Sequence, residues 1–142
     1  MAIVTRSFLF DGGIDPEEAK TSFRKANPGS MVQTIIFDVC KNARTLEVIA
    51  GQTLTAVDTG NLVARKPEID FLLRIAGTTQ IAEAIRKAGS TRGEPFVLVT
   101  SAKAKKLKVP AGLGGVPMKR RPLGQEDYDM IERGALLNVE RN

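Results

Sequence analysis

The segment from Pro67 to Ala76 constrains the fold most, because it carries apolar side chains on two opposite sides of a predicted helix. Phe71 and Ile75 lie nearly opposite the other apolar positions at about 100° of turn per residue. Those other positions form one stripe: Ile69, Leu72, Leu73 and Ala76. An ordinary surface helix has a single apolar stripe that faces the core. The second stripe therefore needs a cover, either from this chain or from another protein.

The predicted final helix, residues 125–139, repeats this pattern. Met130 and Leu137 point nearly away from its main apolar stripe. That stripe contains Tyr128, Ile131, Ala135 and Val139, with Leu136 at its margin. Burial of both sides within the chain and contact with a protein partner are both open explanations. Because exposed apolar patches usually mark contact sites, we predict that a partner covers four side chains. These are Phe71, Ile75, Met130 and Leu137.

The length and the apolar content predict one soluble domain spanning residues 1–142. A chain of 142 residues with 42% hydrophobic side chains is long enough to bury a core. No secretion signal and no apolar run of about 18 residues is visible, so we expect a cytoplasmic protein that does not enter a membrane. Cys40 is the single cysteine, which agrees with a reducing compartment. It follows an apolar run, which favours a buried small hydrophobe over a nucleophile.

The absence of histidine restricts the possible chemistry. It excludes histidine-based acid/base catalysis, Ser-His or Cys-His nucleophile pairs and histidine-ligated zinc. A small-molecule enzyme would have to rely on Glu68, Asp70 or a lysine, and no convergent acid/base spacing supports that reading. We therefore expect no catalytic residue, no cofactor, no metal and no small-molecule substrate.

The net charge of +5 suits a polyanionic partner. No acidic residue interrupts the cations between Lys103 and Arg121, and the same stretch is rich in glycine and proline. It predicts a flexible basic loop around residues 102–122. This loop either follows a phosphate backbone or is an ordinary solvated loop, and the sequence leaves both readings open. The absence of a Gly-Lys-Ser/Thr sequence argues against a nucleotide-binding P-loop.

The predicted fold class is α/β (α+β), with a small mixed or antiparallel sheet packed against about five helices. Strands are expected over residues 3–10, 31–39 and 95–100, with a short edge strand over 116–119. Helices are expected over residues 15–27, 42–60, 67–76, 79–88 and 125–139. Asp15, followed by Pro16 and by Glu18 three residues after the cap, is the strongest helix start.

Residues 61–89 resemble the central signature of the kinase-binding subunit of the KEOPS (EKC) complex, which makes threonylcarbamoyladenosine in tRNA. The matching runs are Asn61-Leu62-Val63-Ala64-Arg65, Pro67-Glu68-Ile69-Asp70-Phe71-Leu72-Leu73, Ala76-Gly77-Thr78-Thr79-Gln80-Ile81 and Ala84-Ile85. The order of the elements is similar over nearly the whole chain, as far as Ala135-Leu136-Leu137. The basic loop has no counterpart in the resemblance.

This resemblance implies a non-catalytic protein that binds a small atypical kinase/ATPase and helps the complex hold tRNA, including its single-stranded acceptor end. The four surplus apolar side chains are then the predicted kinase contacts. The predicted RNA contacts are the cations on or beside the signature block: Arg65, Lys66, Arg74, Arg86 and Lys87. Taken one by one, these cations fit an ordinary solvated helix face better, whereas the cluster as a whole favours an RNA contact. The alternative function is a stand-alone basic RNA-binding module without a kinase partner.

Overall fold

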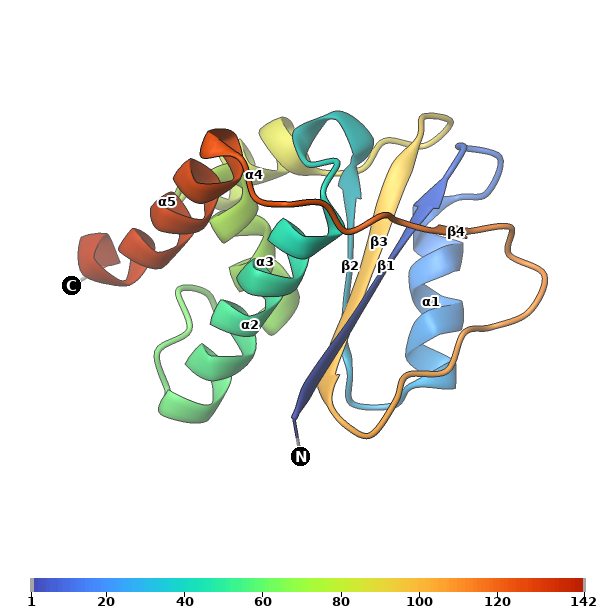
Figure 1. The fold of residues 1–142 in the computed structure, drawn as a ribbon, viewed down its shortest axis with the longest axis horizontal. Coiled ribbons are helices and arrows are strands. Elements are labelled where there is room, and N and C mark those ends of the chain that lie inside the picture. The colour runs from blue at the N-terminus through green and yellow to red at the C-terminus, as the bar shows by residue number, and fades with distance from the viewer. Residues whose placement is uncertain (1, 142) are drawn as a thin grey trace.

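The computed structural model describes residues 2–141, with only the backbone described for residues 140 and 141. These residues form a single α+β domain with a four-stranded antiparallel sheet and five α-helices (Figure 1). The strands are β1 (Ile3–Phe10), β2 (Met31–Ile36), β3 (Phe96–Lys103) and β4 (Val116–Pro117). The helices are α1 (Pro16–Ala26), α2 (Ala43–Thr59), α3 (Pro67–Ala76), α4 (Ile81–Ala88) and α5 (Gln125–Arg141).

The sheet lies between two helical layers and has the strand order β2-β3-β1-β4. Helix α1 covers one face, and helices α2 to α5 lie on the other (Figure 1). Side chains of the central strand β3 alternate between these layers, as the pleat of a strand requires. Phe96 and Leu98 join the core on the α1 side, whereas Val97 and Val99 join the larger core beneath the other helices. The sheet is therefore buried on both faces.

Local sequence signals fix most helix boundaries where they were predicted. The side chain of Asp15 accepts a hydrogen bond from the backbone N–H of Glu17 at 3.0 Å and caps α1. Helices α2 and α3 both end at a glycine with positive φ, 70° at Gly60 and 71° at Gly77. The bounds of α3 match the prediction residue for residue.

Three predicted strands differ in length from the observed ones. The edge strand covers only Val116–Pro117, and the register of the sheet decides the length of the other two. The second strand ends at Ile36, opposite the first residue of β3, so residues 37–39 have no strand residue opposite them and form a 3-10 turn. Strand β3 continues beyond Thr100 to Lys103, which is paired with Ile3 at the start of β1. Its last residues are polar, which hides this extension from an apolar pattern.

Residues 104–121, called the basic strap below, leave the end of β3, pass beside α1 and cross the sheet at β4 (Figure 1, orange). The strap is held at both ends. The side-chain amide of Asn27 accepts from the backbone N–H of Lys108 at 2.7 Å and donates to its carbonyl at 2.8 Å. Asn42 repeats this arrangement with the backbone of Arg121, at 3.1 and 3.3 Å. Between these clamps, β4 pairs with β1, and Gly115 lies so close to Phe10 that a Cβ atom would be 2.5 Å from the ring.

Candidate functional site

The prediction that Phe71 and Ile75 contact a partner is wrong, because both side chains are buried in this molecule. Their exposed fractions are 0% and 1%. Helix α3 packs against α2, α4, α5 and β2, so elements of the same chain cover both of its apolar sides. Of the two explanations that the sequence left open, burial of both sides within the chain is therefore the correct one for this helix.

Helix α5 exposes most of the side that the pattern favoured as its core face, although Ile131 of that stripe packs against the core. Leu137 is 1% exposed, so its predicted role as a partner contact is also wrong, and Met130 is only partly buried. The opposite side, called the outer face of α5 below, carries three exposed apolar side chains. These are Tyr128, Leu136 and Val139.

Gly134 explains why the side of α5 that carries Leu137 turns inward. A Cβ atom at that position would lie 2.9 Å from Oε1 of Gln52 on α2 and 3.2 Å from Cβ of Arg74 on α3. The missing side chain lets the backbone of α5 approach both helices, and Leu137, one turn later, packs into the same core. Because glycine adds nothing to an apolar stripe, this signal is invisible to a count of hydrophobic positions.

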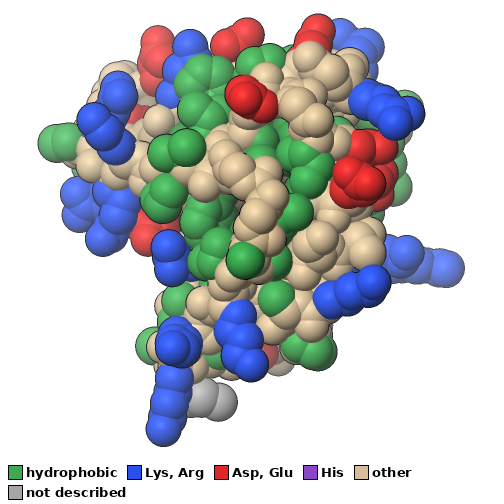
Figure 2. Space-filling view, turned by 90° about the vertical axis from the view of Figure 1, so that its right-hand side faces the viewer, with side chains coloured by type: hydrophobic (Ala, Val, Ile, Leu, Met, Phe, Trp, Pro, Cys, Tyr) green, Lys and Arg blue, Asp and Glu red, His purple; other side chains and the backbone are tan. Residues whose placement is uncertain are grey.

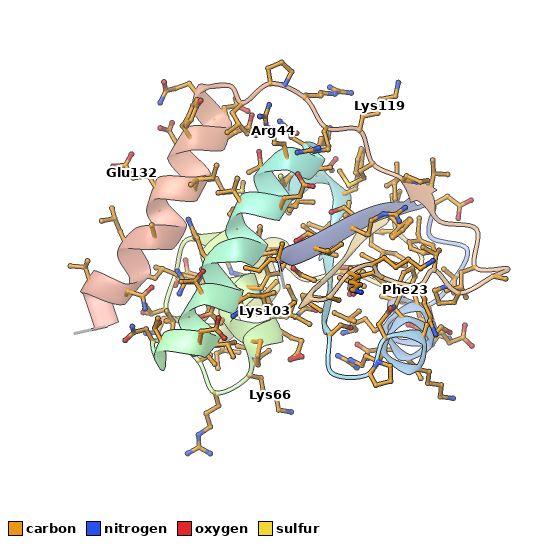
Figure 3. The ribbon with its side chains drawn as sticks, turned by 60° about the horizontal axis from the view of Figure 1, so that its bottom comes forward. Phe23, Arg44, Lys66, Lys103, Lys119 and Glu132 are labelled. Carbon is orange, nitrogen blue, oxygen red and sulfur yellow. The ribbon has the colours of Figure 1, made fainter. Side chains whose placement is uncertain are left out.

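The outer face of α5 combines its apolar side chains with acidic ones. Asp129 and Glu132 are exposed there, and Glu132 projects away from the body of the molecule in Figure 3. A shallow hollow along the helix is lined by Glu126, Asp129, Met130, Glu132, Arg133 and Leu136. Met130 is thus the one predicted kinase contact that still borders an open surface.

The prediction that Arg74 binds RNA is wrong, because its guanidinium is 2% exposed and fully engaged inside the helical layer. Its Nε donates to Oδ1 of Asp70 at 2.7 Å, one helical turn earlier. The two terminal nitrogens also donate to the carbonyl of Gly134 and to Oδ1 of Asn138, at 2.9 and 2.8 Å. The spacing of Asp70 and Arg74, four residues apart among apolar neighbours, is the sequence signal that indicates this pair.

Asp70 connects this ion pair to the loop that precedes α3. Its carboxylate is fully buried and also accepts from the hydroxyl of Thr53 at 2.7 Å and from the backbone N–H of Val63 at 2.9 Å. The amide of Asn138 donates to the carbonyl of Asn61 at 2.6 Å. The network therefore fixes the start of loop 61–66 and leaves Asp70 inaccessible as an acid or base.

Loop 61–66 forms one wall of an apolar groove, called the signature groove below. Its other walls come from α3 and from the chain that leads into α4. The lining residues are Leu62, Val63, Ala64, Arg65, Lys66, Ile69, Leu73, Thr79 and Ile81. Arg65 and Lys66 are exposed cations at this site, and Lys66 extends away from the loop into solvent in Figure 3. Two of the predicted RNA contacts are thus placed together.

Arg86 and Lys87 lie in the last turn of α4 and do not line the signature groove. Both are exposed, and both approach the carboxylate of Glu83, at 3.9 and 3.0 Å. The hydrogen bond and charge of Lys87 are the main reasons why the pKa of Glu83 lies below its ordinary value. Part of the positive charge at this end of α4 is therefore neutralised locally.

The described part of the chain offers few candidates for a reactive cysteine, a metal site or a membrane-spanning helix. Cys40 is buried, as predicted, and burial raises the pKa of its thiol, which keeps it protonated at neutral pH. Among the described residues, no cluster of histidine, cysteine or acidic side chains is arranged to ligate a metal. Within the same residues, no helix combines the length and the apolar character that a membrane crossing needs.

Comparison with known proteins gives one partial similarity. No protein-family model matches the chain. The chain is 42% identical over 65 residues to a UPF0102 protein from Clavibacter michiganensis subsp. michiganensis, covering 46% of this chain and 54% of that relative. It therefore spans about half the length of the curated relative that it matches. The name of that relative states no activity, substrate or partner.

Proposed function

We propose that this chain is a non-catalytic subunit of a KEOPS-like tRNA-modifying complex in the cytoplasm. In this role it binds the small atypical kinase/ATPase subunit and helps recruit tRNA, including its acceptor end, for threonylcarbamoyladenosine formation. The observation that carries the proposal is spatial: residues from the separate runs of the KEOPS-like signature meet in the signature groove.

The signature groove has the chemistry that a single-stranded RNA end requires. Leu62, Ile69 and Ile81 offer apolar surface to the flat face of an unpaired base. Arg65 and Lys66 are available to the adjoining phosphates, and arginine also stacks on bases. Loop 61–66 is positioned by the Asp70 and Asn138 contacts, so little ordering is needed on binding.

The outer face of α5 is the proposed kinase-binding surface, in place of the buried residues predicted from the sequence. Tyr128, Leu136 and Val139 expose apolar area, and aromatic side chains are enriched in the cores of protein interfaces. Asp129 and Glu132 add negative charge, which would keep RNA phosphates away from this surface. The kinase and the RNA are thus assigned to surfaces of opposite charge.

The kinase assignment is tested by measuring how strongly the purified chain binds the KEOPS kinase subunit of the same organism. Leu136→Glu is expected to weaken binding at least about tenfold, because it places a charge in the core of the interface. Ile85→Glu, on the exposed side of α4, is the matched control and should change binding by less than about twofold. Equal binding by the wild type and both variants would reject the assignment.

The RNA assignment is tested with a single-stranded oligoribonucleotide that has the sequence of the tRNA acceptor end. Its affinity should fall as salt rises, with a log–log slope of about −0.7 for each contacted phosphate. Arg65→Gln with Lys66→Gln should reduce that slope by about 1.4, and Arg86→Gln with Lys87→Gln should reduce it less. A slope that is flat in the wild-type chain would contradict the proposal.

The alternative, a stand-alone RNA-binding module, differs in its dependence on the kinase. A KEOPS-type subunit should hold full-length tRNA more tightly within the complex than alone. Equal tRNA affinity with and without the kinase would favour the stand-alone module. Catalytic turnover by the purified single chain would contradict both functions.

A further inference from the structure

One end of the molecule gathers cations from three separate segments. Helix α1, the end of β3 with the beginning of the basic strap, and loop 61–66 all reach the lower end of the molecule in Figure 1. Helix α1 and the strap supply five exposed cations there, called the basic track below. They are Arg24, Lys25, Lys105, Lys106 and Lys108.

The strap holds its part of the track in a defined position. Leu107 is buried, whereas Lys106 and Lys108 on either side of it are exposed, as expected for alternating side chains of an extended segment. The amide of Asn27, at the C-cap of α1, fixes the backbone of Lys108 through two hydrogen bonds. Asn27 therefore also brings the lysines of the strap next to Arg24 and Lys25 in the last turn of α1.

The charge of the basic track is not neutralised by neighbouring acids. Within the described residues, none of its five members forms an ion pair, whereas the nearby Lys103 is paired with Asp58. In Figure 2, which faces the α1 side, Lys and Arg side chains predominate in the lower half, and most acidic ones lie higher. The result is a local positive field much stronger than the net charge of the chain suggests.

A crevice with a mixed polar and apolar lining joins the track to the rest of this end. Lys106 contributes an exposed ammonium group to its lining. The amide of Asn27, the hydroxyl of Ser101 and the ammonium of Lys103 also belong to the lining but are held in contacts within the molecule. Val57 and Asp58 of α2 form the opposite wall, and loop 61–66 follows directly after that helix. The basic track and the signature groove thus lie on either side of the C-terminal end of α2.

We infer that the basic track binds the phosphodiester backbone of the RNA whose acceptor end occupies the signature groove. The identity of that RNA rests on the proposed function, but the positive charge and the concave shape do not. A row of lysines and arginines without aromatic side chains matches phosphates rather than bases, so this contact orients the RNA without reading its sequence. The crevice beside the track makes this end concave, which fits a strand of phosphates better than a flat lipid surface.

The test compares two triple variants that remove the same charge. Lys105→Gln, Lys106→Gln and Lys108→Gln alter the track. Lys41→Gln, Lys119→Gln and Arg121→Gln alter the region where Asn42 clamps the opposite end of the strap. Full-length tRNA and the acceptor-end oligoribonucleotide are titrated between about 50 and 200 mM salt. The track variant should bind tRNA at least about tenfold more weakly and lose about two to three units of log–log slope. Its binding to the oligoribonucleotide, and both affinities of the control, should change less than about twofold.

Equal loss of tRNA binding in the two variants would overturn the inference, because it would show a general charge effect. Unchanged tRNA binding by the track variant would also overturn it. In a parallel titration with phosphatidylserine vesicles, a track variant that lost vesicle binding but kept tRNA binding would overturn it as well. The proposed function fails by a different result, in which Arg65→Gln with Lys66→Gln leaves oligoribonucleotide binding unchanged. Thermal unfolding of all variants confirms that the comparison is made between folded proteins.

Discussion

Helices α3 and α5 have similar two-sided patterns but different environments. In α3 both apolar sides are covered by the same chain, because this helix lies at the centre of its layer. In α5 only the side with Gly134 and Leu137 is covered, and the other side remains open. A surplus of apolar side chains therefore does not by itself indicate an interface. The position of a helix within its layer decides which surplus is exposed.

The largest expected effect is in the core of α3. Asp70→Ala leaves the guanidinium of Arg74 buried without its carboxylate, so the free energy of unfolding should fall by about 3–5 kcal/mol. Urea denaturation measures this change. Glu83→Ala removes a carboxylate from exposed pairs on α4 and should leave the free energy of unfolding nearly unchanged. A comparable cost for both variants would show that burial does not distinguish the two sites.

The two sides of α5 can be compared through adjacent leucines. Leu137→Ala should lower the free energy of unfolding by about 2–5 kcal/mol, because its side chain is 1% exposed. Leu136→Ala, at a residue 47% exposed, should cost less than about 1 kcal/mol. The same truncation at successive positions controls for helix propensity. Similar losses at both positions would contradict the inward orientation of Leu137.

Gly134 tests the reason for that orientation. Gly134→Ala gains about 1 kcal/mol of helix propensity but crowds Gln52 and Arg74, so a net loss of about 1 kcal/mol is expected. Gly51→Ala in α2 is the control, because no atom lies within 4 Å of the added Cβ there. It should stabilise the protein by about 0.5–1 kcal/mol. Stabilisation by both substitutions in thermal unfolding would show that α5 approaches less closely.

The smallest expected effect concerns the pH dependence of protein stability. It arises at Asp127 near the start of α5, whose carboxylate accepts a hydrogen bond from Thr45 on α2. The backbone N–H of Gly124 is the main cause of a lowered pKa at Asp127, followed by the hydroxyl of Thr45. A carboxyl group with a lowered pKa in the folded state stabilises the protein at pH values above its ordinary pKa of about 4. This stabilisation is lost as the pH falls through the lowered pKa of the folded state. Asp127→Asn should flatten the acid limb of stability against pH. Asp129→Asn removes the same charge from the outer face and provides the control.

Much of the fold could be predicted because its signals are local. Pro67 and Gly77 define α3, and Asp15 and Gly60 define other helix ends, each through a backbone preference of one residue. The length of β3 could not be predicted, because pairing with a strand more than ninety positions earlier extends it to Lys103.

The candidate site was less predictable, because exposure depends on contacts between distant segments. Arg65 and Lys66 are exposed as predicted, whereas Arg74 is buried through its pairing with Asp70 and its contact with α5. The apolar positions of α5 were recognised, but their orientation depends on a glycine that a hydrophobicity pattern ignores. The roles of these surfaces in binding the kinase and RNA stay predictions.

The packing of α5 against α3 also affects the order in which the protein can fold during synthesis. A ribosome releases α3 well before it releases Gly134 and Leu137, so one apolar side of α3 lacks its final neighbour during that interval. Strand β1 likewise waits for β3. The nascent chain should therefore depend on chaperone protection until α5 emerges, and truncation before Leu137 should produce aggregation-prone material.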